Sequence, residues 1–259
     1  MKIFNSLISA FSMYSKIPMP QIEWKEENRR YALCFFPLIG AVIGGLFLLW
    51  KYICDRLGIG NFLFGAVSAF IPIIVTGGIH IDGFCDVIDA RSSYGSKEKK
   101  LEIMDDPHVG SFAIIYLCIY FILQTALFCE INDQGTAIII ACGYVLSRAL
   151  SGIAAVSFKN AKGDGLLHNF SVPAHKKINV GVIVTIIILI CAAMTLGSVM
   201  TGISAALGAL LCFLYYRISS YKIFGGITGD LAGWFLQLCE IAVLAFAVIG
   251  EKITEVLFI

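Results

Sequence analysis

Charged residues are scarce in this chain: Asp, Glu, Lys and Arg make up only 14% of its 259 residues, while 58% of the residues are hydrophobic. The mean hydropathy of +0.85 is far above that of soluble domains, in which roughly half of the residues are apolar. The polar stretches between the apolar runs are short, and none predicts a separate water-soluble domain. These shortages exclude an ordinary soluble enzyme and indicate an integral membrane protein.

Two further absences narrow the functional classes. The formal net charge is only +1 and no basic stripe runs along the sequence, so we expect no nucleic-acid partner. The nine cysteines are scattered singly and form no Cys-x-x-Cys pair, which argues against a zinc site or a disulfide framework. We interpret the cysteines as small apolar residues of the membrane interior.

Long apolar runs are abundant, and about 20 residues suffice to cross a bilayer as a helix. Seven runs are present, and the sixth is the shortest: they lie at approximately 31–54, 62–79, 111–129, 136–157, 178–200, 203–216 and 231–249. An eighth run, at 4–14, is too short to span, and we expect it to form a helix at the membrane interface. The pattern predicts an all-α fold, a polytopic membrane helix bundle of about seven transmembrane helices.

The distribution of lysine and arginine predicts the orientation of this bundle. If the N-terminus is cytoplasmic, fifteen of these residues fall in cytoplasmic segments and only three, Lys51, Arg56 and Lys252, fall outside. Positive charge concentrates on the cytoplasmic side of membrane proteins. We therefore expect an N-in/C-out topology for a single integral membrane domain over residues 1–259. Its longest polar segment is a cytoplasmic acidic loop at 80–110.

A short acidic run opens that loop. Asp82, Asp86 and Asp89 recur at i, i+4 and i+7, which places them on one face of a helix. Neighbouring carboxylates repel one another unless a cation lies between them, and Mg²⁺ prefers carboxylates together with substrate phosphate oxygens. The run therefore indicates a metal–phosphate site beside the membrane, although a plain solvated helix has the same spacing.

Two other features accompany the acidic run. Glu102, Asp105 and Asp106 form a second acidic face further along the loop. The segment 77–82 is echoed at 225–230, because each begins with two glycines and ends with an aspartate five residues after the first. The echo suggests that two similar turns bring Asp82 and Asp230 to the same membrane surface.

Glycines and cations near these acids could bind phosphate. Paired glycines let backbone N–H groups approach a phosphate closely, but they serve equally well as turn or packing residues. Arg148 lies inside the fourth apolar run, where a charge needs an anionic partner or a water-filled cavity. It could bind a phosphate or form a structural ion pair with Glu240. His80 could act as a general base or be structural.

The order of these motifs resembles the cobalamin synthase family, the adenosylcobinamide-GDP ribazoletransferases. The matching segments are TGGIHIDGFCDVID at 76–89, LEIMDD at 101–106, SRA at 147–149 and KIFGGITGD at 222–230. With Gly110, Gly233 and Glu240, the resemblance covers nearly the whole chain. The chain departs from the family pattern at His108, where an arginine is common, and at Ala113, where a glycine is common.

The resemblance implies a Mg²⁺-dependent enzyme in the plasma (inner) membrane of a prokaryote, multi-pass and with its active site facing the cytoplasm. It would join adenosylcobinamide-GDP to α-ribazole or its 5′-phosphate and release GMP. The substrates and the lipid bilayer are the expected partners, and self-association as a homo-oligomer is left open.

From the motifs and the resemblance together we predict three groups of site residues. The predicted catalytic residues are His80, Asp82 and Asp86. The predicted metal ligands are Asp82, Asp86, Asp89 and Asp230. The predicted substrate-binding residues are Gly77, Gly78, Arg91, Glu102, Asp106, Arg148, Lys222, Gly225, Gly226 and Thr228.

Two other classes of membrane protein carry comparable acids. A CDP-alcohol phosphatidyltransferase also has an Asp-Gly motif, but typically with an Ala-Arg shortly after it and further aspartates well downstream. Here Ala90-Arg91 follows only after the third aspartate. A cation transporter would carry its acids near the middle of the spans, whereas these acids lie at the predicted cytoplasmic ends.

Overall fold

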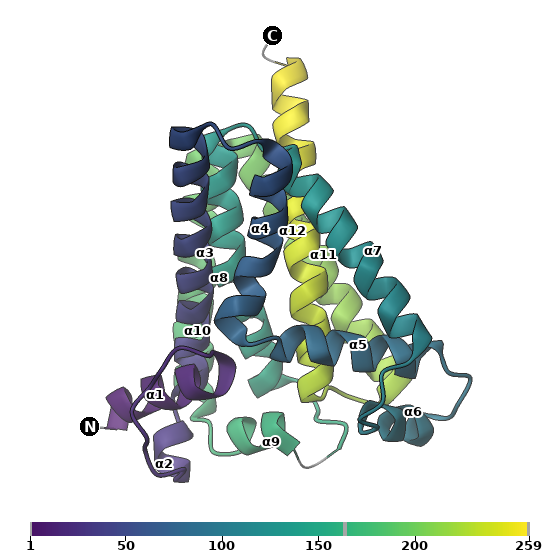
Figure 1. Ribbon diagram of the computed structural model, residues 1–259. Coiled ribbons are helices and arrows are strands. Elements are labelled where there is room, and N and C mark those ends of the chain that lie inside the picture. Colours follow the sequence, from purple (N-terminus) through teal and green to yellow (C-terminus); the bar gives the residue numbers. More distant parts are fainter. Residues whose placement is uncertain (1, 163–164, 258–259) are drawn as a thin grey trace.

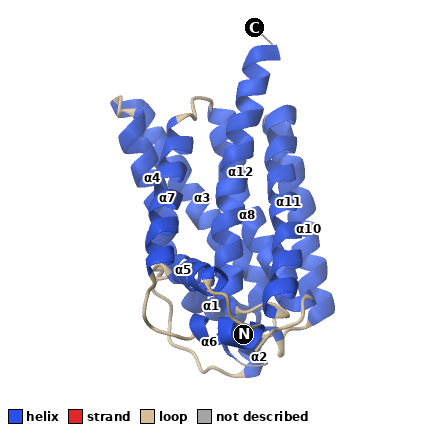
Figure 2. Cartoon of the chain, turned by 90° about the vertical axis from the view of Figure 1, so that its right-hand side faces the viewer, coloured by secondary structure: helices blue, strands red, loops and turns tan. Residues whose placement is uncertain are grey.

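The computed structural model describes residues 2–162 and 165–257, which form twelve helices and no β-strand. Seven long helices run side by side (Figure 1, Figure 2): α3 (Ala32–Leu57), α4 (Asn61–Thr76), α7 (Ser111–Cys129), α8 (Gln134–Ser157), α10 (Lys176–Gly197), α11 (Val199–Phe224) and α12 (Gly229–Leu257). Five shorter helices gather at one end of this bundle: α1 (Lys2–Tyr14), α2 (Glu26–Arg29), α5 (Ile79–Ser92), α6 (Lys97–Met104) and α9 (Gly165–Ser171).

The structure confirms the prediction of a polytopic helical membrane protein. Six of the helices are long and apolar enough to cross a membrane, and α4 with α5 makes a seventh candidate that is bent by 99°. Only α4 of this pair runs along the bundle, while α5 lies across its end (Figure 1). The two termini lie at opposite ends (Figure 1), as an odd number of crossings requires.

The bend between α4 and α5 depends on two glycines in the left-handed region. Gly77 has φ 67° and Gly78 has φ 83°, a backbone conformation that glycine adopts without steric penalty. The N–H of Gly77 donates to the carbonyl of Ile73 and ends α4. The predicted second span at 62–79 was therefore wrong at its end, because the apolar run continues through a bend that hydropathy does not detect.

The predicted sixth span, at 203–216, was too short. The helix α11 begins after the cap residue Ser198, continues past Arg217 and ends at Phe224, a length of 26 residues. The polar residues after 216 stay helical up to the cap at Gly225, which has φ 81°, and among them Arg217 lies over the ring of Tyr221.

The core of the bundle forms around α8, which packs against α3, α10 and α12. Small residues permit this close packing. A side chain at Gly40 of α3 would lie 2.3 Å from the carbonyl oxygen of Tyr144, and one at Gly44 would lie 2.7 Å from that of Ala141. By contrast, α10 and α7 present mostly exposed apolar side chains, which suits a surface covered by lipid.

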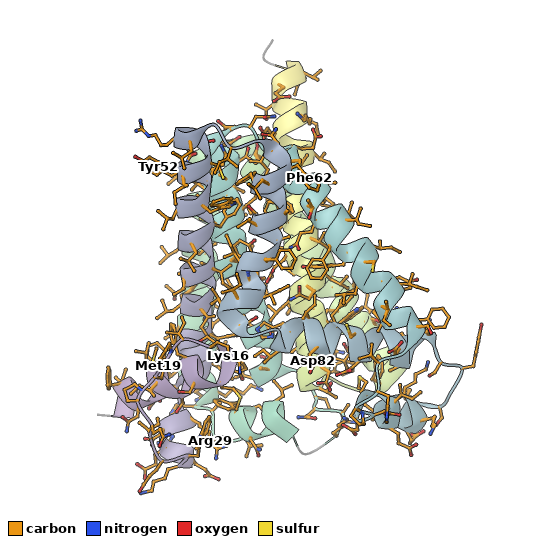
Figure 3. All side chains as sticks on the ribbon, in the orientation of Figure 1. Lys16, Met19, Arg29, Tyr52, Phe62 and Asp82 are labelled. Carbon is orange, nitrogen blue, oxygen red and sulfur yellow. The ribbon has the colours of Figure 1, made fainter. Side chains whose placement is uncertain are left out.

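The end of the bundle that carries α5, called here the site end, also carries Asp82, Lys16 and Arg29, whereas Tyr52 and Phe62 lie at the opposite end (Figure 3). The short apolar helix predicted at 4–14 is α1, which lies at the site end. That the site end faces the cytoplasm stays a prediction.

Candidate active site

The helix α5 crosses the first turns of α12 in direct backbone contact. A Cβ atom at Gly83 would lie 2.7 Å from the Cα of Asp230, and one at Gly233 would lie 2.9 Å from the carbonyl oxygen of His80. Ordinary side chains at these positions would hold the two helices apart. The crossing therefore sets Asp82 of α5 close to Asp230 of α12.

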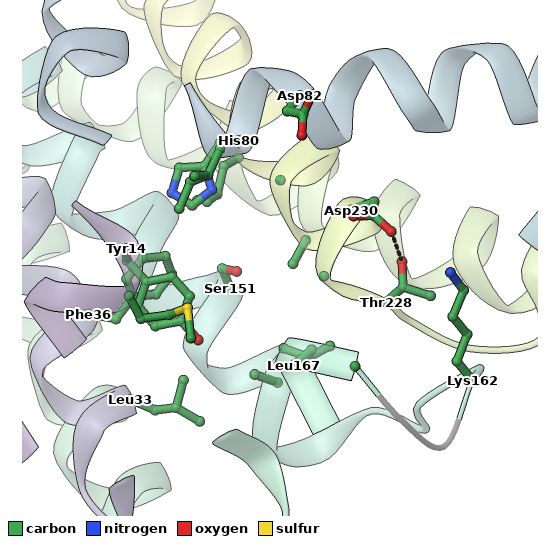
Figure 4. A pocket seen from close by; sticks show the side chains of 18 of the residues that line it. Tyr14, Leu33, Phe36, His80, Asp82, Ser151, Lys162, Leu167, Thr228 and Asp230 are labelled. Carbon is green, nitrogen blue, oxygen red and sulfur yellow. Dashed lines mark hydrogen bonds between the residues drawn. The ribbon is translucent and has the colours of Figure 1, made fainter. Parts of the chain in front are cut away.

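A cavity of about 570 Å³ lies at this crossing and is lined by residues of α1, α3, α5, α8, α9 and α12 (Figure 4). Asp82 and Asp230 both line it, which confirms that the two echoed turns bring these aspartates together. The alternative of α5 as a plain solvated helix is wrong, because His80, Phe84 and Val87 are buried.

The cavity has two chemically different ends. One, called here the polar end, carries Asp82, Asp105, Lys162, Thr228 and Asp230. The other, called here the aromatic end, carries Tyr14, Leu33 and Phe36. Figure 4 shows the labelled members of each end on opposite sides, with His80, Ser151 and Leu167 between them.

Negative charge exceeds positive charge around the polar end. Partial burial, together with the neighbouring carboxylates of Asp82, Asp230 and Asp89, raises the pKa of Asp86 to about 7. The ammonium group of Lys162 acts in the opposite direction. A carboxylate cluster that is short of positive charge suits a hard divalent cation such as Mg²⁺.

The arrangement fits a metal that shares its coordination with a substrate. Among the residues described, no three His, Cys, Asp or Glu side chains are placed to hold an ion by themselves. Mg²⁺ usually binds through one or two carboxylates, several waters and substrate phosphates. Asp82 and Asp230, which line the cavity, are the side chains that could supply the protein's share. The predicted ligand Asp86 lies near both of them but does not line the cavity.

Asp89 has a different environment from the other predicted metal ligands. Its carboxylate accepts hydrogen bonds from the backbone N–H of Gly110, at 2.6 Å, and of Ala113, at 3.0 Å. These groups form the first turn of α7, where unpaired N–H groups favour a negative charge. Asp89 does not line the cavity, and the structure shows it as the cap of α7.

One residue of the second acidic face lines the cavity and the other two are exposed to solvent. Asp105 lines the cavity and pairs with Lys162 at 2.6 Å. Glu102 is exposed and pairs with Lys99, and Asp106 accepts a hydrogen bond from the N–H of His108 at 2.9 Å. Because α6 ends at Met104, helical spacing does not govern the residues after it. The structure thus brings Asp105 to the cavity and not the predicted Glu102 and Asp106.

Lys162 is a functional candidate that was not predicted from the sequence. Its loop is held against the turn before α12: the N–H of Ile227 donates to the carbonyl of Lys159 at 2.8 Å, and Ala161 donates back to Ile227 at 2.9 Å. A Cβ atom at Gly226 would lie 2.5 Å from the carbonyl oxygen of Lys159. Gly226 therefore permits the contact that places Lys162 in the cavity.

The remaining predicted glycines and Thr228 have structural partners. Gly77 and Gly78 form the α4–α5 bend, Gly225 ends α11, and none of the three lines the cavity. Thr228 lines the cavity, donates to the carboxylate of Asp230 at 3.4 Å and accepts from the N–H of Leu231 at 3.2 Å. Thr228 thus orients Asp230 (Figure 4).

The three predicted cations do not line the cavity. Arg91 donates to the hydroxyl of Tyr215 at 2.8 Å and lies over the ring of Trp234. Lys222 is exposed. Arg148 is completely buried and forms an ion pair with Glu240, which is the structural alternative that its sequence position left open.

His80 is one of two polar side chains, with Ser151, that the structure places between the two ends of the cavity. It is only 6% exposed, and its Nε2 atom has no hydrogen-bond partner among the residues described. Its ring meets that of Phe36 edge to face, with the centroids 6.0 Å apart. An unsatisfied buried nitrogen on a side chain that lines a cavity is a position where a ligand can bind.

Comparison with known proteins identifies the family. The family model described as cobalamin-5-phosphate synthase matches residues 6–248. The chain belongs to this family. The matched range contains every residue that lines the cavity, so the family resemblance seen in the sequence is confirmed and includes the site.

Curated relatives support the assignment over nearly their full length. A protein of Lachnoclostridium phytofermentans is 48% identical over 254 residues, covering 98% of this chain and 97% of the relative. Relatives from Treponema denticola and Clostridium perfringens are 34% and 32% identical, each covering 93% of this chain and 96% of the relative. All three are named adenosylcobinamide-GDP ribazoletransferase. No solved structure matches the chain.

Proposed function

We propose that this chain is an adenosylcobinamide-GDP ribazoletransferase, and that its reaction takes place in the cavity between α5 and α12. The observation that carries this proposal is the polar end, where carboxylates from two helices and a lysine meet in one concave site. A site for a diphosphate and a metal needs anionic ligands for the metal and a cation for the phosphate oxygens. The active site would face the cytoplasm, in the plasma (inner) membrane of a prokaryote.

The reaction joins a hydroxyl group to a phosphorus atom. The 3′-oxygen of α-ribazole, or of its 5′-phosphate, forms a bond with the phosphorus nearest the cobinamide. The bridging P–O bond of the diphosphate breaks, and GMP leaves with the bridging oxygen. The hydroxyl proton passes to His80 or to an aspartate, since both kinds of group line the cavity and general bases act at hydrogen-bond distance.

The chain's own residues prepare this transfer. The ammonium group of Lys162 would bind a phosphate oxygen, in competition with its present partner Asp105. Thr228 holds the carboxylate of Asp230 toward the cavity. Asp82 and Asp230 would hold Mg²⁺, which when bound screens the phosphate charge and orients the diphosphate.

The test is GMP release from adenosylcobinamide-GDP and α-ribazole by the purified protein in liposomes. We expect Asp82→Asn and Asp230→Asn to lower the rate by about 100-fold or more. Glu255→Gln, an exposed acid at the opposite end of α12, is the matched control and should keep the wild-type rate. Near-normal Mg²⁺-dependent turnover in both aspartate variants would overturn the site assignment.

The same preparation separates the other two classes. Release of CMP from a CDP-linked lipid, without GMP release from the corrinoid, would indicate a phosphatidyltransferase. Cation flux across the liposome membrane without either transfer would indicate a transporter. Chelation of divalent ions with EDTA should abolish GMP release, and re-addition of Mg²⁺ should restore it.

A further inference from the structure

The aromatic end of the cavity is a preformed apolar site that the phosphate chemistry does not use. The ring of Tyr14 packs against that of Phe36 with the centroids 4.5 Å apart, and Phe36 meets His80 at 6.0 Å. Leu33, which is 2% exposed, also lines this end. Aromatic and aliphatic walls of this kind suit a flat apolar ring, since stacked or edge-to-face rings gain energy beyond area burial.

Polar groups at this end are few and specific. His80 is 6% exposed and Ser151 is 4% exposed, and both line the cavity next to the aromatic residues. The Nε2 atom of His80 has no partner among the described residues. A ligand here would meet the imidazole of His80 and the hydroxyl groups of Tyr14 and Ser151 on a mostly apolar wall, so a flat ring with few hydrogen-bonding groups fits best.

We propose that the aromatic end holds the planar base of the nucleoside acceptor, with the free ring nitrogen of the base accepting a hydrogen bond from the Nε2–H of His80. An aspartate, and not His80, then takes the hydroxyl proton. This inference rests on the proposed function and assigns a subsite within the same cavity. The ribose would then extend past Ser151 toward the polar end, and its hydroxyl groups would reach the carboxylates of Asp82 and Asp230. The order along the cavity, base then sugar then phosphate, matches the order along the joined product.

The other two ring systems of the substrates, guanine and the corrin ring, fit the aromatic end poorly. Guanine carries donors and acceptors along several edges, and burying them against Tyr14, Leu33 and Phe36 would leave most of them unsatisfied. The corrin ring with its side chains is several times larger than a two-ring base. A cavity of about 570 Å³ is of the size that encloses one drug-sized molecule, so the corrin ring stays outside it.

The test is equilibrium dialysis of the purified full chain, in nanodiscs, with radiolabelled α-ribazole and separately with adenosylcobinamide-GDP. Leu33→Trp fills the aromatic end and should weaken α-ribazole binding by about tenfold or more, with the corrinoid affinity within about twofold of wild type. Tyr14→Leu removes one ring of the stack and should weaken α-ribazole binding about threefold to tenfold. Leu210→Trp, at a 51% exposed leucine of α11, is the matched control and should change neither affinity.

An analogue tests the hydrogen bond separately. The indole nucleoside, in which carbon replaces the free ring nitrogen, should bind wild type about threefold to tenfold more weakly than α-ribazole does. His80→Phe keeps a ring at this position and should remove that difference. The proposal would be overturned if Leu33→Trp and Tyr14→Leu lost affinity equally for both substrates, or if neither variant changed the affinity for α-ribazole. An unchanged preference of His80→Phe for α-ribazole over the indole nucleoside would also overturn it.

Binding and transfer are measured independently, so the two proposals can fail separately. Absence of GMP release by wild type, with α-ribazole binding retained and lost in Leu33→Trp, would reject the proposed reaction and support the base subsite. GMP release by wild type, with no effect of the aromatic-end variants on α-ribazole binding, would support the proposed reaction and reject the base subsite.

Discussion

Replacing Gly83 with alanine should impair catalysis because it forces apart the helices that carry the carboxylates. The added Cβ would lie 2.7 Å from the Cα and 2.9 Å from the carbonyl oxygen of Asp230. Both atoms belong to the backbone of α12, so no side chain can rotate away. Reaching an ordinary contact of 3.4 Å requires α5 and α12 to separate by about 0.7 Å.

Two opposing contributions set the expected change in stability of Gly83→Ala, and the displacement of the carboxylates sets the change in rate. Overpacking costs about 1–3 kcal/mol, and the better helix propensity of alanine offsets about 1 kcal/mol of it. The displacement of Asp82 relative to Asp230 matters more, because a misplacement on the order of 1 Å can lower a rate about 100-fold. We expect Gly83→Ala to remain folded and to release GMP about 10 to 100 times more slowly than wild type.

The assay is GMP release in liposomes, with thermal unfolding of the same preparation. Gly181→Ala is the matched control, because Gly181 is an exposed helical glycine of α10 and a Cβ there would meet nothing within 4 Å. That control should keep the wild-type rate and gain up to about 1 kcal/mol of stability. A Gly83→Ala protein with the wild-type rate would refute the reasoning that backbone contact sets the carboxylate geometry.

Three further predictions concern buried and titrating charges. Arg148→Met alone should destabilise the protein by about 3–5 kcal/mol in chemical denaturation, because it leaves Glu240 buried and unpaired, and a smaller loss in the Arg148→Met, Glu240→Met double variant would confirm that cause. Asp89→Ala should lower the stability by about 0.5–2 kcal/mol through loss of the α7 cap. A large change in the Mg²⁺ dependence of GMP release would contradict the cap assignment. The pKa of Asp86 is raised to about 7, so the folded state binds a proton that the unfolded state releases near pH 4. The metal-free protein should therefore become less stable as the pH rises from about 4 to 7; Asp86→Asn should flatten this dependence of the melting temperature, and an equally steep profile would exclude Asp86 as its source.

Apolar runs predicted the helix bundle well because each crossing must bury about 20 residues in lipid. The errors fall where backbone conformation, and not hydropathy, ends a helix. The α4–α5 bend depends on left-handed φ angles at Gly77 and Gly78, and the same two glycines could equally have bound phosphate. At α11, polar residues after 216 stop the apolar run although the helix continues.

The parts of the candidate site that depend on a short sequence motif could be predicted from the sequence. Asp82 lies on the acidic face of one helix, and the echoed turn predicted its meeting with Asp230. Lys162 and Asp105 were not predictable, because their roles depend on a loop packed against Ile227 and on an ion pair 57 residues apart in sequence. Arg148 had two plausible partners in the sequence, and only the packing of α8 against α12 distinguishes Glu240 from a phosphate.

The helix α12 has functional or structural contacts at three positions along its length. Asp230 lies in its first turn, Glu240 pairs with Arg148 in the interior, and Glu251 accepts hydrogen bonds from the backbone N–H groups of Asn132 and Asp133 near the far end. Inserting or deleting one residue of a helix turns everything beyond it by about 100°. The stretch from 230 to 251 is therefore intolerant of any change in length, and its residue count can be expected to stay constant among homologous chains even where the amino acids themselves vary.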